Sequence, residues 1–468
     1  MFLDKGVDYN KSDYSRQSPL IKACEFGHTE IVEMLLERGA DWNQCDCNEQ
    51  SPLMKACEYG QTEIFKMLLE RGADYNKCDC NGSYKNSEDV VRQEVDIDQQ
   101  DENEQTLVMN ACKHDHTEIL KMLLDREADC IICDKYDQSP GMIACEYGHA
   151  EIVKMLIERG ADCNKCDRID RSQVMKACEY GHTEIVKMLI DQGADVNIID
   201  CIGWSRLVIA SEDNYTDIVK MFLDIGADCN TCDEYDQTPV SKACVHGHTE
   251  ILEILIDRGS DFKKCDRRGQ SPVMKACANG HTKVVKMLLD IGIDINQHDD
   301  NDQTLVMKAC EHGHTEIVMM LLDEGADCNK CDSYDQSPVL IPCEYGHTEI
   351  FKMLIESGAD YSRCDSIGRS PLMISCEQGH TKIVEMLLDR GTDFSIYDCM
   401  GWTPVMMACE EGHAEIVKML LNSGEDCNKC NEDDQTLLTK ACEHGHTDIL
   451  KLTEEQIKIY AIVLVGHL

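Results

Sequence analysis

Residues 51–72 read SPLMKACEYGQTEIFKMLLERG and contain the signals for two helices joined by a tight turn. Ser51 is a good helix N-cap, and Pro52 suits the first helical position because its missing N–H has no partner there. Gly60 fits a left-handed C-cap, and Thr62 is expected to cap the second helix. The second helix carries a broad apolar stripe. One unit is therefore predicted to be a helix, a turn, a helix and an extended loop.

The same unit recurs along the chain with a period of 33 residues. One slot of the repeat holds histidine or a substitute in His28, Gln61, His116, His149, His182, Tyr215, His248, His281, His314, His347, His380, His413 and His446. The step from Gln61 to His116 is 55 residues, which is one period plus 22. A fixed period of this length indicates an array of stacked units, so function is expected on a surface built by stacking rather than in one pocket.

The net charge of −43 restricts the classes of partner. It argues against binding to nucleic acid, which needs Lys and Arg to neutralise phosphates, and against an anionic membrane surface. No apolar run approaches the ~20 residues that span a bilayer, so no membrane insertion is expected. The charge favours a basic partner; the alternative is that acidic residues only solvate a long particle.

Thirty cysteines could suggest a disulfide framework, but their positions follow the repeat. One slot holds Cys24, Cys57, Cys112, Cys145, Cys178, Cys244, Cys277, Cys310, Cys343, Cys376, Cys409 and Cys442. Stacked repeats lie roughly 10 Å apart, beyond the ~7 Å between Cα atoms that a disulfide spans. These thiols are therefore predicted to be buried apolar fillers. Because residues 1–5 show no secretory signal, an intracellular location is expected, cytoplasmic or alternatively nuclear.

The repeat resembles the ankyrin repeat in several stretches. Matching segments include Gln270–Cys277, Gly346–Ile350 and unit endings such as Gly160–Asn164. The resemblance implies an all-α fold, an α-solenoid of about 13 ankyrin-type helix-turn-helix repeats with short β-hairpin-like loops. Met54 and Met274 stand where the family has histidine, so the hydrogen bond made by that histidine is not expected here.

Five segments are predicted along the chain. They are a partial N-terminal repeat at 1–12, ankyrin repeats at 13–78, a degenerate repeat or insertion at 79–100, ankyrin repeats at 101–452 and a non-repeat apolar tail at 453–468. For 79–100 we prefer a degenerate repeat that has lost about one helix, and a flexible loop is the alternative. The tail either docks on the last unit or shows that the sequence is a piece of a longer protein.

Prolines and capping residues mark two kinds of irregularity. Eight of the nine prolines fall in the first helical slot: Pro19, Pro52, Pro140, Pro239, Pro272, Pro338, Pro371 and Pro404. Pro342 falls inside a first helix instead, where it removes a backbone donor at a cost of about 3 kcal/mol, so a weak helix is predicted near 340–346. The unit with Asp115 and Glu127 in place of capping glycines, and the unit with Arg206 and Tyr215, are candidate hinges.

The sequence shows no catalytic constellation. Five C-x-x-C pairs occur, at Cys130/Cys133, Cys163/Cys166, Cys229/Cys232, Cys328/Cys331 and Cys427/Cys430. Each could be half of a zinc site, but their spacing follows from the repeat. The recurring histidines are interpreted as structural, tying the turn between helices to a neighbouring loop through backbone hydrogen bonds. We therefore expect no enzyme activity, no cofactor and no metal.

The resemblance implies a concave binding face formed by loop tips and first helices. The expected partner-binding residues there are Phe26, Glu58, Tyr59, Tyr136, Glu146, Tyr147, Glu179, Tyr180, Trp204, Tyr235, His312, Tyr334, Glu344, Tyr345 and Trp402. Exposed aromatic rings beside carboxylates suit a protein partner with basic and apolar anchor residues. The alternative is that the pairs only reflect copying of one ancestral unit.

The predicted function is a non-catalytic protein–protein interaction scaffold. One alternative is a substrate-targeting adaptor or effector arm of a larger complex, such as a ubiquitin ligase. Another is a thiol-rich metal or redox buffer, which the repeat-derived spacing of the cysteines disfavours. The identity of the partner does not follow from the sequence.

Overall fold

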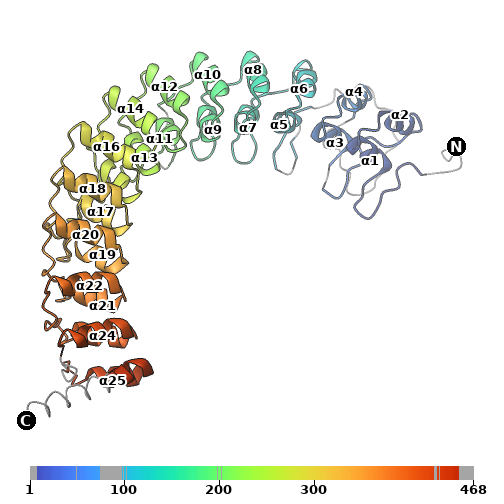
Figure 1. The fold of residues 1–468 in the computed structure, drawn as a ribbon. Helices are drawn as coiled ribbons and strands as arrows, with labels where there is room; N and C mark the ends of the chain where they lie inside the picture. The colour runs from blue at the N-terminus through green and yellow to red at the C-terminus, as the bar shows by residue number, and fades with distance from the viewer. Residues whose placement is uncertain are drawn as a thin grey trace, which may run out of the picture. The chain divides into compact units, whose positions relative to one another are not determined.

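The computed structural model describes residues 8–48, 50–73, 97–98, 100–101, 103–197, 199–201, 203–425, 430–431 and 433–452. The chain divides into two units, unit 1 (Met1–Glu234) and unit 2 (Tyr235–Leu468), which are described separately. In both units a first helix and a second helix form each repeat, and like helices of adjacent repeats pack together (Figure 1). The predicted all-α solenoid of helix pairs is confirmed.

The described residues of unit 1 form six helix pairs. The first helices are α1 (Pro19–Glu25), α3 (Pro52–Glu58), α5 (Leu107–Lys113), α7 (Pro140–Tyr147), α9 (Gln173–Glu179) and α11 (Arg206–Glu212). The second helices are α2 (Thr29–Glu37), α4 (Thr62–Glu70), α6 (Thr117–Leu124), α8 (Ala150–Glu158), α10 (Thr183–Asp191) and α12 (Thr216–Asp224).

Unit 2 continues the same pattern. Its first helices are α13 (Pro239–His246), α15 (Pro272–Ala278), α17 (Leu305–Glu311), α19 (Leu340–Tyr345), α21 (Pro371–Glu377), α23 (Pro404–Glu410) and α25 (Leu437–His444). Its second helices are α14 (Thr249–Asp257), α16 (Thr282–Asp290), α18 (Thr315–Asp323), α20 (Thr348–Glu356), α22 (Thr381–Asp389) and α24 (Ala414–Asn422), and residues 447–452 are also helical.

The first helices begin as the sequence predicts. The Ser51 hydroxyl accepts a hydrogen bond from the Met54 N–H at 3.2 Å, and Pro52 occupies the first helical position. The Met54 sulfur in turn accepts from the Ser51 N–H at 3.4 Å, which closes a capping box. The methionine that replaces the family's histidine therefore takes part in the cap, although sulfur is a weak acceptor. Gly60 follows with a φ of +68°, as a left-handed cap requires.

The second helices begin differently from the prediction. Thr62 is the first residue of α4 rather than its cap, and Gln61 is the N-cap without a side-chain hydrogen bond. Histidines of the recurring slot hold this position in most other repeats, as His182 does before α10. The prediction of a Thr cap was wrong because the slot residue already turns the chain, while the Thr62 hydroxyl donates to the Gly60 carbonyl at 3.4 Å.

The core consists of apolar side chains buried between repeats. The slot cysteines are buried as predicted, except Cys442 in α25, which is exposed; within the described residues no first helix follows α25. Burial raises the pKa of the Cys24 thiol to about 12, as expected for an inert filler. Cys45, which lies outside this slot, is disulfide-bonded, whereas the 26 other described cysteines form no disulfide.

The loops between repeats are short turns held by a buried aspartate. Asp134 is 4% exposed, and its Oδ1 accepts hydrogen bonds from the N–H groups of Tyr136 and Gln138, both at 2.9 Å. Asp137 follows with a φ of +61°, a left-handed conformation that Asp tolerates better than most residues. Adjacent loop tips are also joined, as the Arg168 N–H donates to the Tyr136 carbonyl at 3.2 Å. Within the described residues the β-structure is limited to three isolated bridges, such as Cys166 to Ser172.

The helix that contains Pro342 is shortened. α19 has six residues, and its N-cap is Val339, so Pro338 precedes the helix instead of occupying its first position as predicted. Pro342 has no N–H to donate to the carbonyl four residues earlier, and the first turn therefore does not form as an α-helix. The Ser337 hydroxyl is left buried without a hydrogen-bond partner.

Several predicted segments lie wholly or mostly outside the described residues, namely the start of the partial repeat at 1–12, most of 79–100 and the tail at 453–468. The repeats on either side of 79–100 nevertheless stack directly. The Cys57 sulfur donates to the Leu107 carbonyl at 3.7 Å, and the His116 Nε2 lies 2.9 Å from the Glu58 carbonyl oxygen. The hinge assigned to the Arg206 repeat remains a prediction; its helices have ordinary lengths, and Asn214 takes the glycine's place with a φ of +63°.

Candidate functional site

The candidate site repeats a pair of stacked rings at the ends of eight first helices of the described chain. Tyr147 is the last residue of α7, and its ring stacks on His149 with 6.2 Å between centroids and 9° between planes. Tyr180 stacks on His182 in the same way, at 6.2 Å. The Tyr147 and Tyr180 side chains are still 48% and 47% exposed. Each ring is therefore supported from behind and open to solvent in front.

The supporting histidine is fixed by the preceding repeat. The His182 Nε2 lies 3.2 Å from the Glu146 carbonyl oxygen, so the ring bridges two successive repeats. The same contact places the His380 Nε2 3.1 Å from the Glu344 carbonyl oxygen. This confirms the structural interpretation of the recurring histidines. Where this hydrogen bond is made, as by His182 and His446, it orients the ring on which the neighbouring aromatic side chain stacks.

We call this series the ring ladder. In unit 1 its stacked pairs are Phe26/His28, His114/His116, Tyr147/His149 and Tyr180/His182. In unit 2 they are His246/His248, His312/His314, Tyr345/His347 and His444/His446. Tyr59 is 45% exposed and has Gln61 in place of the histidine, but the Lys55 ammonium lies 5.6 Å from its ring centroid.

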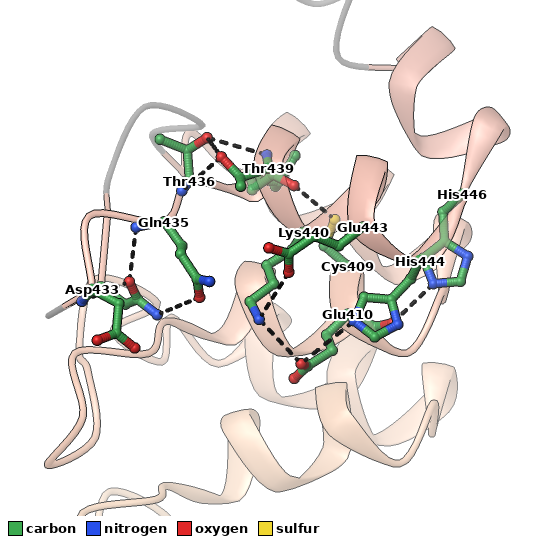
Figure 2. Close-up of polar contacts among 12 residues, drawn as sticks. Cys409, Glu410, Asp433, Gln435, Thr436, Thr439, Lys440, Glu443, His444 and His446 are labelled. Atoms are coloured by element: carbon green, nitrogen blue, oxygen red, sulfur yellow. Dashed lines mark hydrogen bonds and ion pairs between the residues drawn. The ribbon is translucent and has the colours of Figure 1, made fainter.

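Figure 2 shows one ladder position in detail. The His446 Nε2 lies 2.8 Å from the Glu410 carbonyl oxygen. Lys440 reaches two carboxylates, with its Nζ 3.5 Å from Glu410 and 3.2 Å from Glu443. Two residues of the next repeat therefore contact Glu410, with His446 at its backbone carbonyl and Lys440 at its carboxylate.

Lysines beneath the ladder are a feature that the sequence reasoning missed. Lys55 and Lys176 are 7% and 2% exposed, and their ammonium groups pair with Glu58 at 3.0 Å and Glu146 at 2.7 Å. The recurring Lys-Ala-Cys-Glu pattern was the available signal, because a lysine on a buried helix face needs an acidic partner. The negative charges of Glu58 and Glu146 are therefore largely balanced by the ammonium groups of these buried lysines.

The other two acidic site residues also have internal partners. Glu179 lies 3.6 Å from the Arg171 guanidinium, and Glu344 accepts a hydrogen bond from the Gln336 amide at 3.3 Å. Burial, followed by the nearby carboxylates of Glu146 and Glu179, raises the pKa of Tyr180. Tyr180 therefore keeps its hydroxyl proton and remains a hydrogen-bond donor at neutral pH.

The loop aromatics divide into two groups. Tyr136, Tyr235 and Tyr334 are 56%, 54% and 65% exposed at the loop tips. Trp204 and Trp402 are half-buried rather than exposed, which corrects the prediction. The backbone N–H of Trp204 donates to Asp200, and the backbone N–H of Trp402 donates to Asp398. The Lys440 ammonium lies 4.9 Å from the Trp402 ring centroid. These two rings act as part of the loop packing and offer less surface to a partner.

The described part of the chain contains no group of three or more His, Cys, Asp or Glu side chains placed to hold a metal ion. Among the same residues, no helix is long and apolar enough to cross a bilayer. Burial raises the pKa of both thiols in the Cys163/Cys166 pair, which is the opposite of what a reactive or metal-binding thiolate needs.

Stacked helix pairs with a repeated surface of supported rings define a helical-repeat protein of the kind that binds other macromolecules along its surface. The model of the family described as ankyrin repeats matches residues 1–79, 81–167, 164–233, 207–299, 293–365 and 362–431. The chain therefore belongs to the ankyrin-repeat family. None of the curated proteins matches it. Ankyrin repeats are generally protein–protein interaction modules.

Proposed function

We propose that the chain is a non-catalytic scaffold that captures a protein partner on the face formed by first-helix ends and loop tips. The ring ladder is the observation that carries this proposal. Tyr and Trp side chains dominate binding hot spots when they are rigid and accessible. Tyr147, Tyr180 and Tyr345 are about half exposed, and each stacks on a histidine.

The ladder supports a partner that contributes mainly apolar anchors. The rings provide apolar area that is already ordered, so little side-chain entropy is lost on binding. Basic anchors are a second element, since Glu179 and Glu344 keep accessible carboxylate oxygens beside Tyr180 and Tyr345. Glu58 and Glu146 contribute less to recognition, because their charges are paired with Lys55 and Lys176.

The test replaces the three tyrosines together with alanine in Y147A/Y180A/Y345A. Tagged full-length protein would be used to capture partners from a cell lysate, with identification by mass spectrometry. We expect the variant to lose the partners that the unchanged chain retains, and its circular dichroism to stay helical because all three rings lie at the surface.

A matched control removes an exposed apolar side chain on the other helix of a repeat. Met319 lies in α18, a second helix, and is 48% exposed, so M319A removes one side chain as exposed as each ladder tyrosine but away from the ladder. We expect M319A to keep the full set of partners. Unchanged capture by the triple tyrosine variant would refute the ladder as the binding face.

A further inference from the structure

One repeat has a charge opposite to that of the chain. Residues 260–292 contain seven Lys and Arg against three Asp, a formal charge of +4, whereas the whole chain carries −43. Surface charges are screened beyond about 8 Å at physiological ionic strength. A ligand bound at this repeat therefore responds to its local positive charge and not to the net charge of the chain.

This repeat lines a hollow in unit 2. The cavity has a volume of about 420 Å³, and its lining includes Tyr235, Val245, Arg267, Arg268, Ala278 and Asn279. We call it the basic hollow. Arg267 and Arg268 are both exposed at its rim, while Val245 and Ala278 are partly covered in its wall.

The chain contains an internal comparison for the basic hollow. Residues 99 positions earlier fill the same slots three repeats before, and Arg168 corresponds there to Arg267. The earlier copy has Glu146, Ile169, Glu179 and Tyr180 where the later copy has Val245, Arg268, Ala278 and Asn279. The later copy has thus lost two carboxylates and one phenol ring. The number of guanidinium groups is unchanged, because Arg268 is new but Gln270 stands where the earlier copy has Arg171. The same backbone framework carries opposite charge at the two places.

The contacts show which cations are available to a ligand. Lys275 belongs to the wall, because its Nζ lies 2.8 Å from the Asp266 carboxylate and donates to the Ser241 hydroxyl at 2.9 Å. The Arg267 Nε lies 3.2 Å from Asp236, but its side chain is 62% exposed, so the rest of its guanidinium fork is accessible. Within the described residues, no carboxylate pairs with the Arg268 guanidinium, whose N–H groups are open to a ligand.

We propose that the basic hollow binds a short acidic segment of a partner protein, with its Asp or Glu carboxylates paired to Arg267 and Arg268. Guanidinium forks match carboxylates in a two-bond geometry. The cavity is larger than a single small anion needs, and Tyr235, Val245 and Met274 line it with carbon atoms that a peptide can contact. This site uses other residues than the ring ladder, but it also lies among first-helix ends and loop tips and therefore rests on the proposed function of that face. The variants below distinguish its failure from that of the ring ladder.

The test measures binding of a fluorescein-labelled, glutamate-rich peptide to the full-length chain by fluorescence anisotropy at low ionic strength. We expect R267E/R268E to weaken binding about tenfold or more, because each reversal replaces a charge-assisted hydrogen bond with repulsion. We expect A278E, which restores the carboxylate of the earlier copy, to weaken binding as well. The matched control is R168E, which reverses the equivalent arginine in the earlier copy, where Glu146 and Glu179 occupy the slots of Val245 and Ala278, and it should leave the affinity unchanged.

The outcomes are distinct. Loss of binding in R267E/R268E with retention in R168E and in Y147A/Y180A/Y345A supports the proposal. Equal affinity of R267E/R268E and the unchanged chain overturns it, as does absence of peptide binding by the unchanged chain. Displacement of the peptide by inorganic phosphate at equal concentration overturns the peptide assignment and makes the hollow a small-anion site.

Discussion

Replacing Pro342 with alanine is expected to stabilise the chain, although most substitutions at buried positions destabilise. Pro342 is buried in α19, the helix that has six residues and no side-chain cap. The equivalent residue one repeat earlier is Ala309, which is fully buried in α17, so the site accommodates alanine. The cap of that helix is intact, with the Thr304 hydroxyl accepting from the Met307 N–H at 3.3 Å.

The magnitude follows from the bonds that α19 lacks. An alanine N–H at position 342 can donate to the Pro338 carbonyl, which contributes about 1 kcal/mol. The resulting helical turn lets the Ser337 hydroxyl, which is now buried without a hydrogen-bond partner, cap the helix. This cap contributes about another 1 kcal/mol. Alanine also leaves the unfolded chain freer than proline does, which subtracts roughly 0.5–1 kcal/mol. The net expectation for P342A is a gain of about 1–1.5 kcal/mol.

The assay combines urea unfolding with native-state hydrogen exchange over residues 337–346. Exchange locates the effect, since each repeat of a solenoid contacts mainly its neighbours and opens locally. The control is P371A, because Pro371 occupies the first position of α21, where no backbone bond is missing. P371A should lose about 0.5–1 kcal/mol through the unfolded state alone. A change of the same sign in both variants would refute the reasoning.

Two further predictions concern the turns and the buried thiols. G148A should destabilise the chain more than G160A. Both glycines have a positive φ, so each substitution costs about 1–2 kcal/mol. A Cβ at position 148 would also lie 2.6 Å from the His182 ring, whereas a Cβ at position 160 would meet nothing within 4 Å. Equal losses in urea unfolding would contradict this role of the histidine. Cys24 should resist iodoacetamide in the native chain while the exposed Cys201 reacts, because burial raises the pKa of Cys24 to about 12 and leaves almost no thiolate at neutral pH. Timed alkylation followed by peptide mass spectrometry measures both rates, and similar rates would show that Cys24 is not buried.

Features encoded within a few residues of the chain were predictable. Ser51 before Pro52 starts a helix, and Gly60 ends it, because caps and left-handed turns depend on local chemistry. The burial of the slot cysteines was also predictable, since their period is that of the repeat. Asp137 takes a left-handed conformation with a φ of +61°, which also follows from local chemistry because Asp tolerates this region better than most residues.

Features that depend on contacts between repeats were harder to predict. Lys176 is 3% exposed in its side chain because a glutamate 30 residues earlier neutralises it, and no local pattern states that pairing. Trp402 looked exposed in its loop, but Lys440 of the next repeat lies over its ring. The start of the second helices was misjudged for the same reason, because the slot residue such as His182 is held by the preceding repeat.

The copies within the chain offer a way to separate structure from recognition. Positions that stay the same in successive repeats, such as the slot histidines, have contacts that the stack itself requires. Positions where one copy has a different residue, while the contacts that hold the stack together remain, can change to bind a different partner. Arg267 and Arg168 keep the same ion pair, to Asp236 at 3.2 Å and Asp137 at 3.0 Å. The ion pairs beneath the surface differ, since Lys176 pairs with Glu146 whereas Lys275 pairs with Asp266, but the first helices α9 and α15 have the same length. We therefore expect the changes from Glu179 to Ala278 and from Ile169 to Arg268 to alter what the surface binds more than how the repeat folds.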